Sequence, residues 1–313
     1  MLVTDDRHPA DLLNEGHMDN IIRKAVQNGK SATVAIRMAT IQAAQYFGLR
    51  GVGAIAPGYI SNLVVLDDLD SFSVSDVYCR GQKVVNQGKM ISFETPKASE
   101  VLETRIRNSF RLGELKDTDF MLTPSSSECR IIKIIPKQLL TDEWITSLDF
   151  GKNNGVDIER DILKIAVIER HHGTGHIGLG FIHGIGMRKG AIASSISHDS
   201  HNLIVIGTNE KDMALAANRV CAMNGGNAVV AEGEILAEMM LPVGGLMSDE
   251  PAEIVAEQNH KVRKAVDRLG TAEGIEPFMN MAFISLPVIP HLKMTTKGLI
   301  DVQTQKQVPL FIF

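Results

Sequence analysis

The most regular hydrophobic pattern of this chain lies between Lys164 and Gly207, where three short apolar runs alternate with polar loops. KIAVIE (164–169) is β-branched and apolar, which is typical of a buried strand. AIASSIS (191–197) and LIVIG (203–207) have the same character. The pattern predicts strands that end or begin at two histidine-bearing loops, RHHGTGH and HDSHN. Strand ends are where a rigid scaffold commonly presents functional side chains.

The chain after Gly207 combines helical and strand patterns. It predicts a helix with Asn209 as N-cap and Gly225 as terminator, followed by a hairpin that turns at Glu232-Gly233. An amphipathic helix with Pro251 near its first turn comes next. We expect FMNMAFISL (278–286) and the final VPLFIF (308–313) to be strands, and the latter to dock onto the domain.

The first ninety residues predict a mixture of helices and short strands. Leu2-Val3-Thr4 has a strand-like pattern and leads directly into Asp5-Asp6. Two helices are expected next, from Asp19 to about Gln27 and from Thr33 to Gly48, the second with an apolar stripe of Val34, Met38 and Ile41. A buried strand (62–66) and a hairpin that turns near Arg80-Gly81 follow.

Six of the ten histidines lie between Glu169 and Gly207. Imidazole is a common metal ligand and is the side chain best suited to proton transfer near neutral pH. Residues three apart on a strand face opposite ways, so His198 and His201 could share a metal only if the backbone turns between them. Asp199 would then orient a ring N–H. The alternative is that these histidines hydrogen-bond loop carbonyls or line an interface.

Composition and charge narrow the class of protein. With 313 residues, 44% hydrophobic and 22% charged, the chain is expected to be globular and to form more than one core. A net charge of −5 without a block of basic residues argues against a nucleic-acid partner. The apolar runs are too short for a membrane span, and no secretory pattern is present. The three cysteines lack a CxxC spacing, which predicts free thiols and a cytoplasmic protein.

Several segments resemble a known family. TDDRHPADLLNEGHMDNIIRKAVQNG, AIRMATIQAAQYFGL and GAIAPGYISNLVVLDDL with VYCRGQKV resemble the closing section of amidohydrolase-superfamily enzymes, and most closely the adenine deaminase family. RHHGTGHIGLGFIHGIG, GAIASSISHDSHNLIVIGTN, PVGGLMSD and PFMNMAFISLPVIPHLKMTTKGLIDV are similar to the C-terminal domain of that family. Many amidohydrolases lack this domain, so the second resemblance is the more specific one.

The resemblance implies a mixed α/β and α+β fold in three parts. Residues 1–50 would be the C-terminal remnant of a (β/α)8 amidohydrolase barrel, 51–95 a small β-sandwich segment, and 96–313 an α+β domain. A complete barrel takes roughly 250 residues, so the first part would leave apolar helix faces uncovered. Uncovered apolar faces favour association, and we expect a homo-oligomer.

The resemblance also implies a reaction, the hydrolysis of adenine to hypoxanthine and ammonia. In this family a divalent metal, manganese or iron, generates the attacking hydroxide. Asp5 would be the catalytic, metal-proximal aspartate that accepts a proton, with Asp6 meeting the substrate. On pattern alone, this aspartate pair would instead cap a helix or form a turn. His198 and His201 are the remaining candidate metal ligands.

One element of the family pattern is absent from this sequence, because no H-x-H pair occurs in it. We therefore expect a truncated or split enzyme that is inactive alone and needs the missing N-terminal barrel portion as its partner. A second interpretation is a non-catalytic remnant, or a subunit that completes a separate barrel polypeptide. A third is an amidohydrolase that acts on another cyclic amide or amidine. The specificity of the C-terminal resemblance favours adenine.

Overall fold

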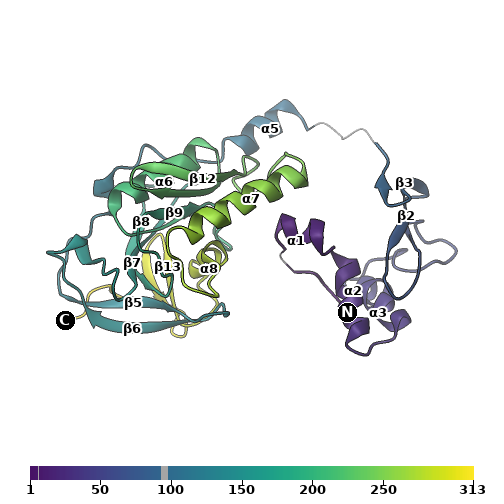
Figure 1. The fold of residues 1–313 in the computed structure, drawn as a ribbon, viewed down its shortest axis with the longest axis horizontal. Coiled ribbons are helices and arrows are strands. Elements are labelled where there is room, and N and C mark those ends of the chain that lie inside the picture. Colours follow the sequence, from purple (N-terminus) through teal and green to yellow (C-terminus); the bar gives the residue numbers. More distant parts are fainter. Residues whose placement is uncertain (6, 93–97) are drawn as a thin grey trace. The chain divides into compact units, whose positions relative to one another are not determined.

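The computed structural model describes residues 1–5, 7–92 and 98–313, which form a mixed α/β structure of two compact units (Figure 1). The first unit is Met1–Lys97 and the second is Ala98–Phe313. In the described part of the chain, no helix is both long and apolar enough to cross a membrane. The three cysteines are free thiols, as the sequence predicts.

The first unit contains four short helices and a small antiparallel sheet. The helices are α1 (Pro9–Asn14), α2 (Met18–Gln27), α3 (Ala32–Ala39) and α4 (Ile41–Tyr46). The sheet has the order β1 (Leu63–Leu66), β2 (Val74–Cys79), β3 (Gln82–Asn86) and β4 (Lys89–Met90). The predicted hairpin between β2 and β3 is confirmed, because Arg80 and Gly81 both have the positive φ that a tight two-residue turn requires.

Two predictions for the first unit are wrong. Leu2–Thr4 forms no strand: the Leu2 N–H donates to the Met38 carbonyl at 3.0 Å, and a strand requires a neighbouring strand to form its ladder. The single helix expected from Thr33 to Gly48 is two helices, because the backbone of Thr40 (φ −124°, ψ −98°) is not helical. Of the expected apolar stripe, Val34 is exposed whereas Met38 and Ile41 are half-buried.

The second unit is built on an eight-stranded sheet with the order β12-β11-β9-β10-β7-β8-β5-β6. All neighbours are antiparallel except β5 and β8, which are parallel. The strands are β5 (Glu128–Ile134), β6 (Thr141–Ser147), β7 (Ile162–Ile168), β8 (Ile177–His183), β9 (Ala191–Ser194), β10 (Leu203–Gly207), β11 (Gly226–Ala231) and β12 (Glu234–Met240). The strands predicted at 164–169, 191–197 and 203–207 are present, the second ending at Ser194.

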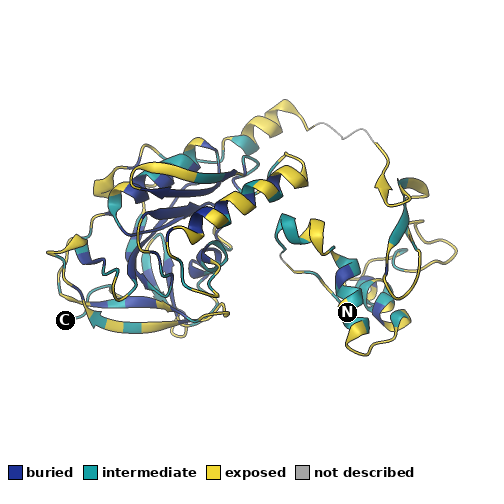
Figure 2. Cartoon of the chain, viewed as in Figure 1, coloured by how far each residue is buried: buried dark blue, intermediate teal, exposed yellow. Residues whose placement is uncertain are grey.

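Helices cover both faces of this sheet, so its central strands are buried throughout (Figure 2). Along β7, Ile165 and Val167 join the core formed with α7 (Ala252–Asp267) and α8 (Pro277–Ile284). Ala166 and Ile168 face the other way, into the core formed with α6 (Glu210–Ala222). Successive side chains of β7 point to opposite faces of the sheet, so the strand contributes to both hydrophobic cores.

Two helices of the second unit begin where the sequence predicts, and a third replaces a predicted strand. Asn209 caps α6 by accepting from the Asp212 N–H at 2.9 Å, and Pro251 directly precedes α7. The strand expected at 278–286 is wrong, because Pro277–Ile284 is the helix α8. Shorter elements are α5 (Glu100–Arg107) and two 3-10 turns, η1 (Asp117–Phe120) and η2 (Asn153–Gly155).

A small three-stranded sheet of β13 (Leu292–Thr295), β14 (Gly298–Asp301) and β15 (Lys306–Gln307) packs close to β8. The close approach depends on two glycines of β8. A Cβ on Gly178 would lie 1.9 Å from the Thr295 carbonyl oxygen, and one on Gly180 would lie 2.4 Å from the Met294 methyl. The final segment docks onto β5, as expected, but only Phe311 forms a bridge there, so it is not a regular strand.

Candidate functional site

The two histidine loops lie at one end of the large sheet because of the strand register. The first histidine loop (169–176) follows β7, and the second (198–202) precedes β10. Ile168 pairs with Leu203, so the last residue of β7 lies directly opposite the first residue of β10. The ring Nε2 of His171 donates to the Ser200 carbonyl at 2.8 Å, which joins the two loops.

The Glu169 carboxylate holds the first histidine loop in shape. It accepts the backbone N–H groups of His171 (2.6 Å), His172 (2.9 Å) and Thr174 (3.1 Å), and also the Thr174 hydroxyl (3.1 Å). Burial acts to raise the pKa of this carboxyl, but these hydrogen bonds outweigh it and lower the pKa to about 2. Glu169 is therefore ionised at neutral pH and serves as the anchor of the loop.

The buried guanidinium of the neighbouring Arg170 holds the second histidine loop in place by hydrogen bonds. Arg170 is 1% exposed, and it donates to the carbonyls of His201 (2.5 Å) and Gly244 (3.0 Å) and to the Ser109 hydroxyl (3.1 Å). Its guanidinium carbon lies 4.4 Å from the centre of the Phe110 ring. Burial lowers the pKa of Arg170 to about 10, so this buried group is still charged at neutral pH.

Neither Glu169 nor Arg170 was singled out from the sequence, although one signal could have found both. A carboxylate and a guanidinium directly follow a strand that is apolar except for Lys164, and charged side chains at such a place must find partners. The histidines are the candidate functional groups of the two loops, whereas Glu169 and Arg170 hold the loops in their conformation.

The backbone turns between His198 and His201, which is the condition for these side chains to act together. A turn covers 198–200, and the His201 N–H donates to the Ser197 carbonyl at 2.6 Å. The His198 ring stacks on Phe283 with 4.6 Å between centroids, and its Nδ1 lies 3.8 Å from a carboxylate oxygen of Asp199. Their joint binding of a metal stays a prediction.

The surroundings of His201 disfavour its protonated form. Burial, and then the positive charge of Arg170, lowers the pKa of His201, which keeps the imidazole neutral at pH 7. Its Nδ1 is buried and has no hydrogen-bond partner among the described residues. A neutral imidazole with an unused ring nitrogen is a suitable ligand or proton acceptor.

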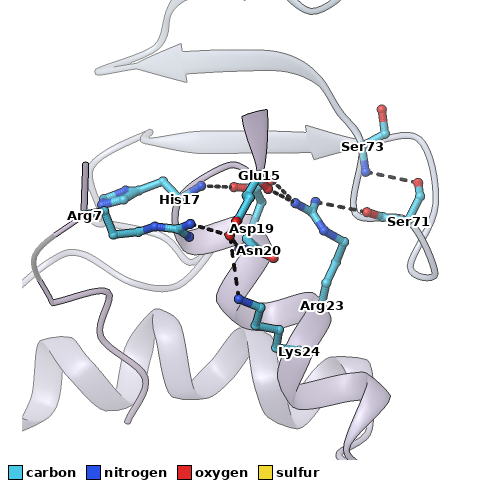
Figure 3. A network of polar contacts seen from close by, with 9 residues as sticks. All are labelled: Arg7, Glu15, His17, Asp19, Asn20, Arg23, Lys24, Ser71 and Ser73. Carbon is cyan, nitrogen blue, oxygen red and sulfur yellow. Dashed lines mark hydrogen bonds and ion pairs between the residues drawn. The ribbon is translucent and has the colours of Figure 1, made fainter. Parts of the chain in front are cut away.

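The aspartates predicted to be catalytic belong to the first unit. Asp5 is exposed and has a positive φ of 56°, whereas Asp6 lies outside the described residues. Two residues further on, Arg7 contacts Glu15 at 2.5 Å, within a network that surrounds the start of α2 (Figure 3). In the same network, Arg23 pairs with Asp19 at 2.8 Å and donates to the Ser71 carbonyl at 3.2 Å.

This network joins the two predicted parts of the first unit. The Arg23–Ser71 hydrogen bond runs from helix α2 to the loop between β1 and β2. The Glu15 carboxylate also accepts from the Asn20 amide at 3.2 Å. The segment that carries Asp5 is thus followed by a polar cluster that is anchored to both the helices and the sheet.

A metal centre requires several ligand side chains that converge on one point. Among the described residues, no group of three or more His, Cys, Asp or Glu side chains is placed to hold a metal ion. Asp5 belongs to the first unit, and the two candidate histidines belong to the second. The described part of this chain therefore does not fit a complete metal site by itself.

Comparison with known proteins gives two family matches. Residues 138–306 match the adenine deaminase C-terminal domain, and residues 1–84 match the amidohydrolase family. An adenine deaminase of Brucella anthropi is 44% identical over 303 residues, which cover 96% of this chain and 52% of that protein. An adenine deaminase of Desulfatibacillum aliphaticivorans is 44% identical over 314 residues, covering 99% of this chain and 54% of that protein.

A further relative, adenine deaminase 2 of Carboxydothermus hydrogenoformans, is 42% identical over 311 residues. These residues cover 98% of this chain and 54% of that relative. The similarity is thus continuous through both units. The chain spans about half the length of the curated relatives that it matches.

Proposed function

Because the chain belongs to the adenine deaminase C-terminal domain family, we propose that it is part of an enzyme that hydrolyses adenine to hypoxanthine and ammonia. The observation that carries the proposal is the continuous similarity of 96–99% of the chain to proteins named adenine deaminase. In this reaction, water adds to C6 of adenine, the C6–N bond breaks, and the amino group leaves as ammonia.

The proposal divides the work between this chain and a second portion. The amidohydrolase family generally uses a divalent metal, for which we propose manganese or iron. The described residues contain no group of three suitable ligands, and we propose that part of the ligand set comes from another portion of the enzyme. We propose the missing N-terminal barrel portion as its source, with residues 1–50 as the end of the barrel and 51–95 as part of a β-sandwich.

Within this scheme, Asp5 is proposed to accept the proton of the attacking water, and Asp6 is proposed to contact the substrate. An ionised carboxylate is suited to that role because a positioned base raises rates by about 10²–10⁴-fold. His198 and His201 remain proposed metal ligands, with Asp199 orienting a ring nitrogen.

The decisive experiment is an ammonia-release assay with adenine, run with this chain alone and with a polypeptide that supplies the rest of the relatives' length, each with manganese or iron. We expect release only from the completed protein. In that protein, Asp5→Asn should lower turnover by about 10²–10⁴-fold. Asp70→Asn is the matched control, because Asp70 is an exposed loop aspartate.

Three outcomes would contradict the proposal. Ammonia release by this chain alone would show that a metal site of another composition is present. A completed protein that deaminates or hydrolyses a different cyclic amide or amidine, but not adenine, would keep the amidohydrolase chemistry and replace the substrate. A completed protein with no activity on any of these substrates would favour the non-catalytic interpretation.

A further inference from the structure

A pocket of about 370 Å³ lies beside the second histidine loop, entirely within the second unit. One side is formed by Ser200 and Asn202 of that loop, and another by Ser285 just after α8. The tip of the β13–β14 hairpin (295–297) forms a further part of the lining. Pockets that hold small molecules commonly begin at about 300 Å³, so this volume admits a one- or two-ring compound.

The pocket adjoins a cluster of unused hydrogen-bonding atoms. In the described part of the chain, four buried side-chain atoms have no hydrogen-bond partner, and two of them are on consecutive residues of this loop, His201 Nδ1 and Asn202 Oδ1. Asn202 is 9% exposed and also lines the pocket. Buried polar atoms in native proteins are nearly always paired, so an exception beside a pocket indicates a group that a ligand satisfies.

The unpaired amide does not result from a loose loop. The carbonyl of His201 accepts from Arg170, and the carbonyl of Ser200 accepts from His171. The Ser285 hydroxyl lies against the Ser197 hydroxyl on the opposite side. These contacts hold the backbone before Asn202, and the pairing of Leu203 with Ile168 holds the backbone after it. The backbone position of Asn202 is therefore fixed, which favours preorganised binding.

The lining indicates the chemistry of the ligand. None of the residues that line the pocket is Asp or Glu, so no group there selects for a cation. The Thr295 hydroxyl already donates to the Gly298 carbonyl, and the Ser285 hydroxyl contacts the Ser197 hydroxyl. The Ser200 and Thr296 hydroxyls are the lining hydroxyls that can donate to a ligand or accept from it. The ammonium group of Lys297 belongs to an exposed residue, whereas Pro287 and Ile300 supply apolar surface for a ring.

From this geometry, we infer that the pocket binds a purine base, which donates a ring or exocyclic N–H to Asn202 Oδ1 and places its face on the apolar part of the lining. A neutral heterocycle with both donors and acceptors matches amide and hydroxyl groups better than an anion does. The choice of purine among such heterocycles rests on the proposed function. The residues that line the pocket all lie between 200 and 305, within the second unit.

The test is calorimetric titration of the intact 313-residue chain, without metal, with adenine, hypoxanthine and inorganic phosphate as separate probes. We expect one base to bind with a single site and phosphate not to bind. Asn202→Ala should weaken binding of the base about tenfold, the effect of losing a buried hydrogen bond. Gln303→Ala is the control, because Gln303 is exposed and does not line the pocket.

A second measurement covers the case in which Asn202→Ala fails to fold. In the unmodified chain, NMR amide shifts on adding the base should be concentrated in 200–202 and 295–297. Thr296→Val, on the hairpin tip, should weaken binding as well. The inference is overturned if neither base binds at millimolar concentration, if phosphate binds instead, or if the shifts fall elsewhere.

These readouts are separate from turnover. Base binding to the pocket by an enzyme that, when completed, releases no ammonia would refute the proposed reaction and retain the pocket. Ammonia release by a completed enzyme, together with a 313-residue chain that binds no base, would retain the reaction and refute the pocket.

Discussion

Replacing Glu169 by glutamine tests whether the carboxylate anchors the first histidine loop. Glutamine has nearly the same shape, but it loses the negative charge and exchanges one acceptor oxygen for a donor. The four donors that converge on Glu169, three N–H groups and one hydroxyl, would then meet a single neutral carbonyl oxygen. Hydrogen bonds to charged groups contribute more than neutral ones, so the loss should be measurable.

The magnitude follows from the pKa of the carboxyl. A fall from 4.5 to about 2 corresponds to about 3 kcal/mol of folding free energy at neutral pH. Because the folded-state pKa is depressed, this contribution is fully present above pH 4.5 and is lost as the pH falls through 2. We therefore expect Glu169→Gln to cost about 2–3 kcal/mol at pH 7, with the difference narrowing below pH 4.5.

Urea unfolding monitored by Trp144 fluorescence measures this directly. Trp144 is the sole tryptophan of the sequence and lies in β6, so its signal reports on the second unit. The matched control is Glu273→Gln, an exposed glutamate, which should leave the free energy of unfolding nearly unchanged. The reasoning is refuted if the Glu169 variant matches the parent at pH 7, or if the gap stays constant from pH 7 to pH 3.

Two further substitutions test other parts of the second unit by the same unfolding assay. Gly178→Ala would place a Cβ 1.9 Å from the Thr295 carbonyl oxygen and should lower the free energy of unfolding by about 3 kcal/mol. Gly113→Ala is the control, because Gly113 has open space around it, and its effect should be far smaller. Equal effects would contradict the close packing of β13 on β8. Lys293 is fully buried with one acceptor, the Leu139 carbonyl, and burial lowers its pKa from 10.5 to about 8. Burying the protonated amine costs folding free energy below pH 8, and this cost disappears above pH 10.5. The parent should therefore gain stability between these pH values, whereas Lys293→Met should not. Parallel pH profiles of the two proteins would contradict this reasoning.

Local chemistry made several elements of this fold predictable from the sequence. The Asn209 cap, the Arg80-Gly81 turn and the Glu232-Gly233 turn each depend on one or two residues whose backbone preferences are strong. The buried strand β7 was predictable because both of its faces are covered, which leaves a run that is apolar except for Lys164.

The errors occur where a pattern has two physical solutions. FMNMAFISL is apolar on nearly all sides, and such a run suits a buried helix as well as a buried strand. The Pro277 that precedes it was the available signal, because proline favours the first turn of a helix. Leu2–Thr4 has a strand-like composition, but composition does not supply the neighbouring strand.

The site was predictable as a region but not as an arrangement. The histidines indicated the correct end of the sheet, because each loop adjoins an apolar run that was recognisable in the sequence. Asn202 as an unpaired amide, and Glu169 and Arg170 as anchors, depend on which atoms meet across distant segments. A local sequence pattern does not contain the information needed to predict these contacts between distant segments.

The register that places Ile168 opposite Leu203 has a consequence for the order in which the second unit folds. The two histidine loops are separated in the chain by β8 and β9, so local hairpin formation cannot bring them together. They meet when β10 pairs with β7, a non-local pairing that is entropically slow. The hydrogen bond from His171 to Ser200 should consequently be among the late contacts to form. Its appearance during refolding would mark the completion of the sheet.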